Sequence, residues 1–264
     1  MSKTYRKVQV VELSTSARTA GRVVETPMRA VADDELLVRN LYAGVNATDM
    51  NITAGRGGYG AANLPFDFGL EGLGVIEALG KSVQGAKGLN VGQVGLVFTG
   101  PPTGPPRAYS EYIYVKPDEF KPIPENKPEY LALLDCGLTA CIGLDQAGRI
   151  TRGETVLITA AAGGTGHIGV QWAKYKGCHV IGMASAPEKI KLLKELGCDR
   201  SGIDVIWETI GGKTFETLFK HLAVGGRLVI VGSITGYKDQ TSAPVVSIPD
   251  INTVLPLVIR PIQA

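Results

Sequence analysis

The segment that most restricts the fold is a β-branched apolar run that leads into a glycine-rich loop and then into a helical stretch. The run Glu154–Ala160 lacks polar alternation, which is typical of a strand buried on both faces. The loop Ala161–Gly169 and the helical segment Val170–Lys176 follow it, and a second strand and helix continue at His179–Ala184 and Pro187–Leu196. Strands that alternate with helices predict a parallel α/β sheet.

Gly164, Gly166 and Gly169 form a G-x-G-x-x-G pattern in this loop. Such glycines permit a tight turn and let the backbone approach a pyrophosphate, while the helix N-terminus offers N–H donors and a positive dipole end. The pattern is weak evidence by itself, but here it has the preceding strand and following helix that it requires. We therefore predict a dinucleotide site; the alternative is a structural glycine-rich turn.

The end of the second strand indicates which dinucleotide is bound. A site that prefers NAD places an acid there, about 20 residues beyond the first glycine, to accept a hydrogen bond from the ribose 2′-hydroxyl. This chain has no acid at the strand tip and instead offers the hydroxyl of Ser185 and the cation of Lys189. These groups fit a 2′-phosphate, so we expect NADP(H). The alternative is that Ser185 caps the next helix and Lys189 is a solvated surface residue.

The first part of the chain contains short apolar runs separated by Gly, Pro and Asp. This spacing predicts a barrel-like antiparallel β domain. The runs are Lys7–Leu13, Glu35–Tyr42, Gly74–Leu79, Val94–Phe98 and Glu111–Val115.

Four prolines between residues 117 and 128 disfavour both helix and sheet interior and indicate a domain boundary. A buried helix is expected to follow at Glu129–Ala147. The predicted organisation is a β domain at 1–120, a Pro-rich boundary at 121–128, a cofactor-binding domain at 129–237 and an irregular tail at 238–264.

Charge and composition disfavour several classes of protein. The 27 Lys and Arg residues nearly balance 25 Asp and Glu residues, and they are not clustered, so no nucleic-acid partner is expected. No secretory signal or membrane-spanning segment is recognised, and the four cysteines have neither disulfide-framework nor zinc-ligand spacing. We expect reduced, mostly buried thiols in an intracellular soluble protein of the cytoplasm or peroxisome, with no targeting signal visible.

Several segments together resemble the quinone oxidoreductase branch of the medium-chain dehydrogenase/reductase superfamily. They are Leu36–Asn40, Gly44–Asp49, Pro65–Gly74, Tyr109–Tyr112 and the glycine loop. The resemblance implies a GroES-like β-barrel domain, a Rossmann-type domain and an active site in the cleft between them. A homodimer is compatible with this resemblance.

Zinc can be judged from the residue types. The alcohol dehydrogenases of this superfamily have Cys where this chain has Asn46 and His where it has Leu70. Neither Asn nor Leu can replace those ligands in a tetrahedral zinc site, so we predict that no metal is bound.

Without a Lewis acid, conjugate reduction of an enone fits better than direct reduction of a carbonyl. Hydride passes from NADPH to the β-carbon, and the enolate oxygen needs preorganised donors. The resemblance, which is strongest to the prostaglandin reductases of this branch, implies 15-oxo-prostaglandins as substrates, reduced at the 13,14 double bond. Candidate donors are Asn46 and Tyr59; alternatively, Asn46 fixes the loop before Asp49 and Tyr59 is a surface aromatic.

Two other functions remain open at this stage. One is an NADPH quinone oxidoreductase with the same fold, and the other is a non-catalytic, truncated cofactor-binding isoform. The resemblance also carries over a set of cofactor-binding positions, in which Thr139 faces the nicotinamide end, Thr165 the pyrophosphate, and Ser185 and Lys189 the 2′-phosphate. The full set is Thr139, Gly164, Thr165, Gly166, Ser185, Lys189, Thr209, Val231 and Tyr237.

The sequence departs from its relatives at two places. Only Ser201 separates Arg200 from Gly202, where relatives insert a strand and a helix, and after Tyr237 relatives continue through a C-terminal segment that returns to the first domain. We therefore expect a Rossmann-type domain that lacks one βα unit and the C-terminal return segment. Loss of the βα unit should leave neighbouring strands unpaired and expose apolar area.

Overall fold

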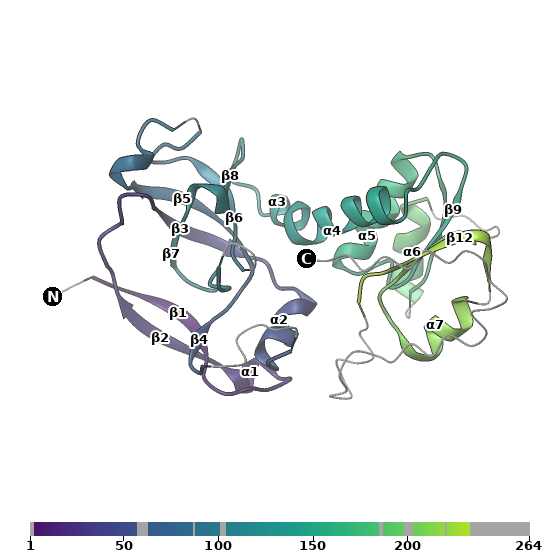
Figure 1. Cartoon of the computed structure of the whole chain (residues 1–264), viewed down its shortest axis with the longest axis horizontal. Coiled ribbons are helices and arrows are strands. Elements are labelled where there is room, and N and C mark those ends of the chain that lie inside the picture. Colours follow the sequence, from purple (N-terminus) through teal and green to yellow (C-terminus); the bar gives the residue numbers. More distant parts are fainter. Residues whose placement is uncertain are drawn as a thin grey trace. The chain divides into compact units, whose positions relative to one another are not determined.

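A computed structural model of the 264-residue chain describes residues 3–56, 63–86, 88–100, 104–184, 187–197, 203–219 and 221–232. The chain divides into two compact units, Met1–Asp135 and Cys136–Ala264, and Figure 1 labels most of their helices and strands. Among the described residues no helix is both long enough and apolar enough to cross a membrane.

The first unit contains a five-stranded antiparallel sheet in the order β7-β3-β5-β6-β8. Its apolar face follows the period of two that a strand requires, because Leu36 and Val38 of β3 and Ile76 of β5 are all fully buried in one cluster. The bounds are β3 Leu36–Ala43, β5 Glu71–Leu79, β6 Val94–Phe98, β7 Tyr112–Val115 and β8 Phe120–Pro122.

A second antiparallel sheet of the first unit has the order β2-β1-β4. The strand β2 has no buried residue, so it lacks the apolar alternation that sequence patterns detect. Short helical segments connect the strands of both sheets. The bounds are β1 Thr4–Val10, α1 Ala17–Ala20, β2 Gly21–Pro27, α2 Ala47–Thr53, β4 Phe66–Asp67, η1 Lys81–Val83 and η2 Pro117–Glu119.

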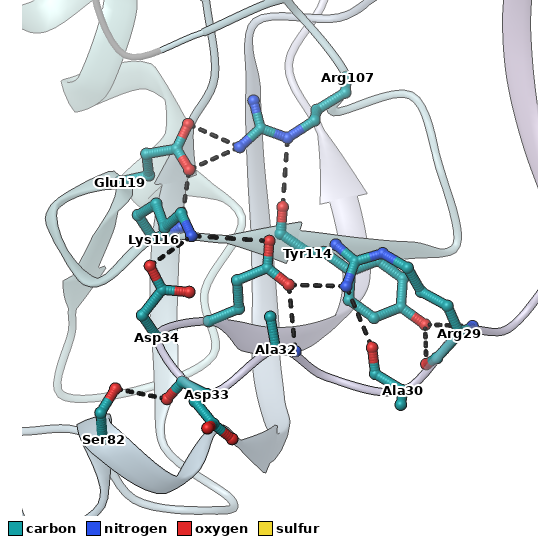
Figure 2. Close-up of polar contacts among 11 residues, drawn as sticks. Arg29, Ala30, Ala32, Asp33, Asp34, Ser82, Arg107, Tyr114, Lys116 and Glu119 are labelled. Carbon is teal, nitrogen blue, oxygen red and sulfur yellow. Dashed lines mark hydrogen bonds and ion pairs between the residues drawn. The ribbon is translucent and has the colours of Figure 1, made fainter.

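Ion pairs tie the segment around β7 to the rest of the first unit (Figure 2). Arg107 Nη2 donates to both carboxylate oxygens of Glu119, at 2.7 and 2.5 Å, and the backbone nitrogen of Lys116 donates to Glu119 Oε2 at 2.8 Å. The Glu119 side chain is only 1% exposed. Nearby, the Arg29 guanidinium lies 3.9 Å from the centroid of the Tyr114 ring, a cation–π contact.

The two units divide between Asp135 and Cys136. The first residues of the expected boundary segment 121–128 belong to β8, which pairs with β6. The next helix begins at Glu129, as expected, and its Leu131 and the following Leu134 pack with Leu73 of β5 in the first unit. The domain limits drawn from the sequence stay a prediction, and the expected tail 238–264 lies outside the described residues.

Residues 129–147 form consecutive helical segments: α3 Glu129–Ala132, the π-helical η3 Leu133–Gly137, α4 Leu138–Ile142 and the π-helical η4 Gly143–Ala147. The helix was expected to be buried, but the side chains of Leu133, Leu138 and Ile142 are 55%, 51% and 42% exposed. The π-helical segment η3 shifts the residues that follow it around the helix axis, which accounts for the exposure of Leu138 and Ile142 but not of Leu133, where η3 begins.

The second unit contains a parallel four-stranded sheet in the order β10-β9-β11-β12. Its strands are β9 Thr155–Ile158, β10 His179–Gly182, β11 Ile203–Glu208 and β12 Leu222–Ile230. All four residues of β9 are buried, which confirms the prediction of a strand without polar alternation. The connecting helices are α5 Gly164–Tyr175, α6 Pro187–Glu195 and α7 Gly212–Phe219.

Apolar side chains cover this sheet on both faces. Val156 and Ile158 of β9 pack with Val170 of α5 in one buried cluster. Leu157, which points to the opposite face, packs with Phe215 and other residues of α7 in a second cluster. Helices on both faces of a parallel sheet confirm the doubly wound, Rossmann-type prediction.

The absence of one βα unit does not interrupt the sheet. The strand β9 pairs with β10 on one side and with β11 on the other, and β11 pairs with β12. The strand β11 is paired on both sides, whereas β10 pairs with β9 alone among the described strands, so the expected unpaired edge is present at β10. In the common doubly wound order the third strand lies outside the second, so its loss shortens one edge and leaves β10 there.

Candidate functional site

The glycine loop forms the connection between β9 and α5. The helix begins at Gly164 with Gly163 as its N-cap, six residues earlier than the helix expected from Val170 onwards. A Cβ on Gly166 would lie 2.3 Å from the carbonyl oxygen of Ala160, so only glycine allows the first turn of α5 to approach the end of β9 this closely. The fingerprint glycines therefore belong to the helix itself and not to a preceding loop.

The first turn of α5 has the properties of an anion site. Gly163 and Gly164 are exposed and Thr165 is half-buried, so the turn can be reached by a ligand. The first backbone N–H groups of a helix have no partner within the helix, and the helix dipole makes this end positive. A Cβ on Gly164 would lie 3.0 Å from Cys136 Sγ, which shows how closely the neighbouring helical segment covers this loop.

The ends of β11 and β12 lie beside the end of β9. The backbone nitrogen of Thr209, the residue after β11, donates to Thr159 Oγ1 at 2.8 Å, and the two threonine hydroxyl oxygens are 3.1 Å apart. The backbone nitrogen of Val231, the residue after β12, donates to the carbonyl oxygen of Glu208 at 2.9 Å. Thr209 and Val231 therefore share the carboxyl edge of the parallel sheet with the glycine loop, where doubly wound folds bind ligands.

Two other predicted cofactor-binding residues lie on helices of the second unit. Thr139 is half-buried on α4, a helix that packs against α5. Lys189 is exposed on α6, the helix that follows β10. Ser185 and Tyr237, and the predicted donor Tyr59, lie outside the described residues, so their predicted roles stay predictions.

Asn46 is held in a polar cluster of the first unit. It is the N-cap residue of α2, and its backbone nitrogen donates to Asp49 Oδ2 at 2.8 Å in a capping box. Its side-chain nitrogen donates to Glu71 Oε1 at 2.8 Å, while Glu71 Oε2 accepts from the backbone nitrogen of Asp135 at 2.9 Å. The Tyr109 hydroxyl lies 2.7 Å from Asp49 Oδ2. Asn46 thus orders the start of α2, and its amide is held by Glu71; its role as a donor to the substrate stays a prediction.

The three carboxyl groups of this cluster share one electrostatic property. Burial raises the pKa of Asp49, of Glu71 and of Asp135, and the negative charges of the neighbouring carboxylates add to the increase for Glu71 and Asp135. Burial and the adjacent Asp49 also raise the pKa of the Tyr109 hydroxyl well above its ordinary range. The cluster therefore favours holding protons, in contrast to the surface carboxylates paired with arginine.

The residues of this cluster do not fit a zinc ion. The amide of Asn46 is engaged with Glu71, and Leu70 is apolar and 3% exposed. In the part of the chain that the structure describes, no group of three or more His, Cys, Asp or Glu side chains is arranged to hold a metal. That the chain binds no metal stays a prediction from the residue types at Asn46 and Leu70.

Two residues of these sites were not singled out from the sequence. Glu71 and Glu208 are 3% and 1% exposed, and each stands at one end of its strand. A buried carboxylate is unusual unless it is hydrogen-bonded, but each strand also contains an acid that is not buried, Glu77 in β5 and Asp204 in β11, so the sequence alone does not single out the buried ones.

The comparisons with known proteins agree with this architecture. A model of the alcohol dehydrogenase GroES-like domain matches residues 32–125. Prostaglandin reductase-3 of Bos taurus is 40% identical over 256 residues, covering 89% of this chain and 65% of that protein. A probable quinone oxidoreductase of Leishmania amazonensis is 38% identical over 261 residues, covering 91% of this chain and 74% of that protein.

A mycobacterial protein solved in complex with NADPH has a similar fold. Its TM-score is 0.82 at 27% identity, and the match covers 98% of this chain and 81% of that one. The chain spans just under two thirds of the length of the bovine relative.

Proposed function

Because the chain belongs to the quinone oxidoreductase branch of the medium-chain dehydrogenase/reductase superfamily, we propose that it is an NADP(H)-dependent oxidoreductase that reduces the carbon–carbon double bond of an enone. The substrate class we propose is a 15-oxo-prostaglandin, reduced at its 13,14 double bond. The proposed reaction uses no metal.

The observation that carries the proposal is the accessible helix N-terminus at the carboxyl edge of the parallel sheet. Gly163 and Gly164 are exposed. Neighbouring atoms leave too little room for a Cβ at Gly164 or Gly166, so backbone atoms themselves form the binding surface. A pyrophosphate fits such a surface because it accepts hydrogen bonds from unpaired N–H groups and is attracted by the positive dipole end. The match to a mycobacterial protein solved with NADPH supports the same cofactor.

The cofactor would be held by residues from several elements of the second unit. The first-turn amides of α5 and the hydroxyl of Thr165 would bind the pyrophosphate, Thr209 and Val231 would line the crevice, and Lys189 would neutralise a 2′-phosphate. When bound, the cofactor supplies the hydride. Thr139 is proposed at the nicotinamide end.

Asn46 is the group that we propose to stabilise the developing enolate. Its amide nitrogen is fixed by Glu71, so the amide does not need to reorganise during the reaction, and the residue is only half-buried. Tyr59 is a second proposed donor. A carbonyl oxygen that gains negative charge would bind such a fixed donor more tightly than the ground-state carbonyl does.

A turnover assay separates this function from its alternatives. The full chain is incubated with NADPH and either a 15-oxo-prostaglandin or a quinone, and oxidation of NADPH is followed. Reduction of the prostaglandin is expected; reduction of the quinone alone would favour the second candidate, which the Leishmania relative supports. Thermal stabilisation by NADPH without reduction of either compound would indicate a non-catalytic cofactor-binding protein.

A substitution tests the choice of cofactor. Lys189→Ala should weaken NADPH binding and leave NADH binding unchanged, because only NADPH carries the 2′-phosphate. Lys213→Ala is the matched control, since Lys213 is also an exposed lysine near the beginning of a helix of the same unit. An unchanged preference for NADPH in Lys189→Ala would show that Lys189 does not bind the 2′-phosphate.

A further inference from the structure

Glu208 is a buried carboxylate to which the proposed hydride transfer assigns no role. It is the last residue of β11, and its side chain is only 1% exposed. Burying a carboxylate costs free energy unless hydrogen bonds compensate for the lost water. The contacts of Glu208 therefore indicate what the carboxyl group is retained to do.

Both oxygens of the carboxylate bind the turn that follows the strand. Oε1 accepts from the backbone nitrogen of Ile210 at 2.9 Å, and Oε2 accepts from the backbone nitrogen of Gly211 at 2.8 Å. The turn has an uncommon backbone conformation, because Gly211 and Gly212 have φ angles of +76° and +57°. Glycine residues allow the backbone of this turn several conformations, and the two hydrogen bonds to the carboxylate select one of them.

The same turn presents Thr209 at the carboxyl edge of the sheet. The backbone nitrogen of Thr209 donates to Thr159 Oγ1 at 2.8 Å, so the residue is anchored to the end of β9 on one side and enters the turn held by Glu208 on the other. The backbone oxygen of Glu208 accepts from Val231 at 2.9 Å. One residue therefore connects the tips of β11 and β12 with the turn between β11 and α7.

We propose that Glu208 is a positioning residue for the cofactor, which fixes the turn 209–211 so that Thr209 is held in place to contact NADP(H). The inference rests on the proposed function, because it presupposes that this crevice binds the cofactor. Glu208 acts through Thr209 and does not itself touch the ligand.

Calorimetric titration of the full chain with NADPH tests this role in four proteins: the wild type, Glu208→Gln, Thr209→Ala and the double variant. Glutamine can accept from one backbone amide but presents its own N–H₂ to the other, so Glu208→Gln should weaken binding roughly tenfold. Because Glu208 acts through Thr209, the double variant should bind no more weakly than the weaker of the two single variants. Glu154→Gln is the control, since Glu154 is a half-buried carboxylate bonded to Arg227 and to the backbone nitrogen of Thr151, just before β9.

The outcomes are distinguishable. If the wild type does not bind NADPH, the proposed function fails and this inference fails with it. If the wild type binds but Glu208→Gln binds equally well, or if the effects of the two substitutions simply add, only the positioning role is overturned. Should Glu208→Gln not fold, Glu208→Asp keeps the charge on a shorter side chain and should also weaken binding; failure of both variants to fold would make the role of Glu208 purely structural and overturn the inference.

Discussion

The side-chain nitrogen of Asn46 lies 2.8 Å from Glu71 Oε1, so the amide that caps α2 is also oriented by a buried carboxylate. A residue with two roles requires a substitution that separates them. Serine caps a helix about as well as asparagine does, but its short side chain carries no amide N–H.

Asn46→Ser should therefore reduce turnover of the enone by roughly tenfold to a hundredfold, because it removes one oriented hydrogen-bond donor to the developing enolate oxygen. The free energy of unfolding should fall by only about 1 kcal/mol, because the cap is kept while Glu71 loses one donor. Steady-state kinetics and urea denaturation measure the two effects. Loss of stability with unchanged turnover would assign Asn46 to the helix cap alone.

The raised pKa of Glu71 predicts a specific pH dependence of stability. A carboxyl group with a folded-state pKa above its unfolded value stabilises the folded state at acid pH, and this contribution is lost as the pH rises through the folded-state pKa. Glu71→Gln removes the ionisation, so the stability of the variant relative to the wild type should improve as the pH rises above the ordinary pKa of a glutamate, as denaturation at several pH values would show.

Glu35 provides the opposite control for that experiment. Its hydrogen bond to Arg29 lowers the pKa of the carboxyl, so its contribution is present above the unfolded pKa and is lost as the pH falls through the folded-state pKa. Glu35→Gln should therefore lose stability relative to the wild type near neutrality and recover towards the wild type in acid. Parallel trends for the two variants would contradict the assignment of opposite shifts.

Two of the fingerprint glycines, Gly166 and Gly169, are predicted to differ in their tolerance of a side chain. Gly166→Ala would place Cβ against the backbone oxygen of Ala160, at 2.3 Å, and should cost about 1–3 kcal/mol of stability and weaken NADPH binding. Gly169→Ala is the matched control in the same helix, because its Cβ would make only an ordinary contact of 3.5 Å with Ile158 Cδ1. Thermal denaturation should show Gly169→Ala within about 1 kcal/mol of the wild type.

Removal of one partner from the Arg107–Glu119 ion pair should be strongly destabilising. Arg107→Ala leaves the carboxylate of Glu119, 1% exposed, without its bidentate partner, which typically costs about 3–5 kcal/mol. Arg6→Ala is the control, because Arg6 and Glu111 form an exposed pair that solvent screens, so its loss should cost far less. Equal losses of unfolding free energy in the two variants would contradict the distinction between buried and exposed pairs.

The elements that the sequence predicts well are those whose burial leaves a periodic pattern. The buried strand β9 and the sheet strands β3 and β6 were recognised from their apolar runs. The exposed strand β2 was not, because its stability depends on pairing with β1 and not on a buried face. The helix α5 was expected too late, since glycine has a low helix propensity and only the close approach to Ala160 explains its presence in the first turn.

The candidate sites were predictable to a similar extent. The fingerprint identified the glycine loop, and Thr209 and Val231 do lie at the same sheet edge. The supporting carboxylates Glu71 and Glu208 were missed, because their roles come from hydrogen bonds to residues distant in sequence or to backbone groups of a turn. Such hydrogen bonds leave no periodic pattern in the sequence that could reveal them.

The most direct test of the central claim is a thermal-denaturation titration of the full chain with NADPH and, in parallel, with NADH. A ligand that binds only the folded state raises the melting temperature, and the increase grows with the logarithm of its concentration relative to its Kd. The account predicts a concentration-dependent increase with NADPH and a smaller increase at equal concentrations of NADH. No increase with NADPH at millimolar concentration would contradict it.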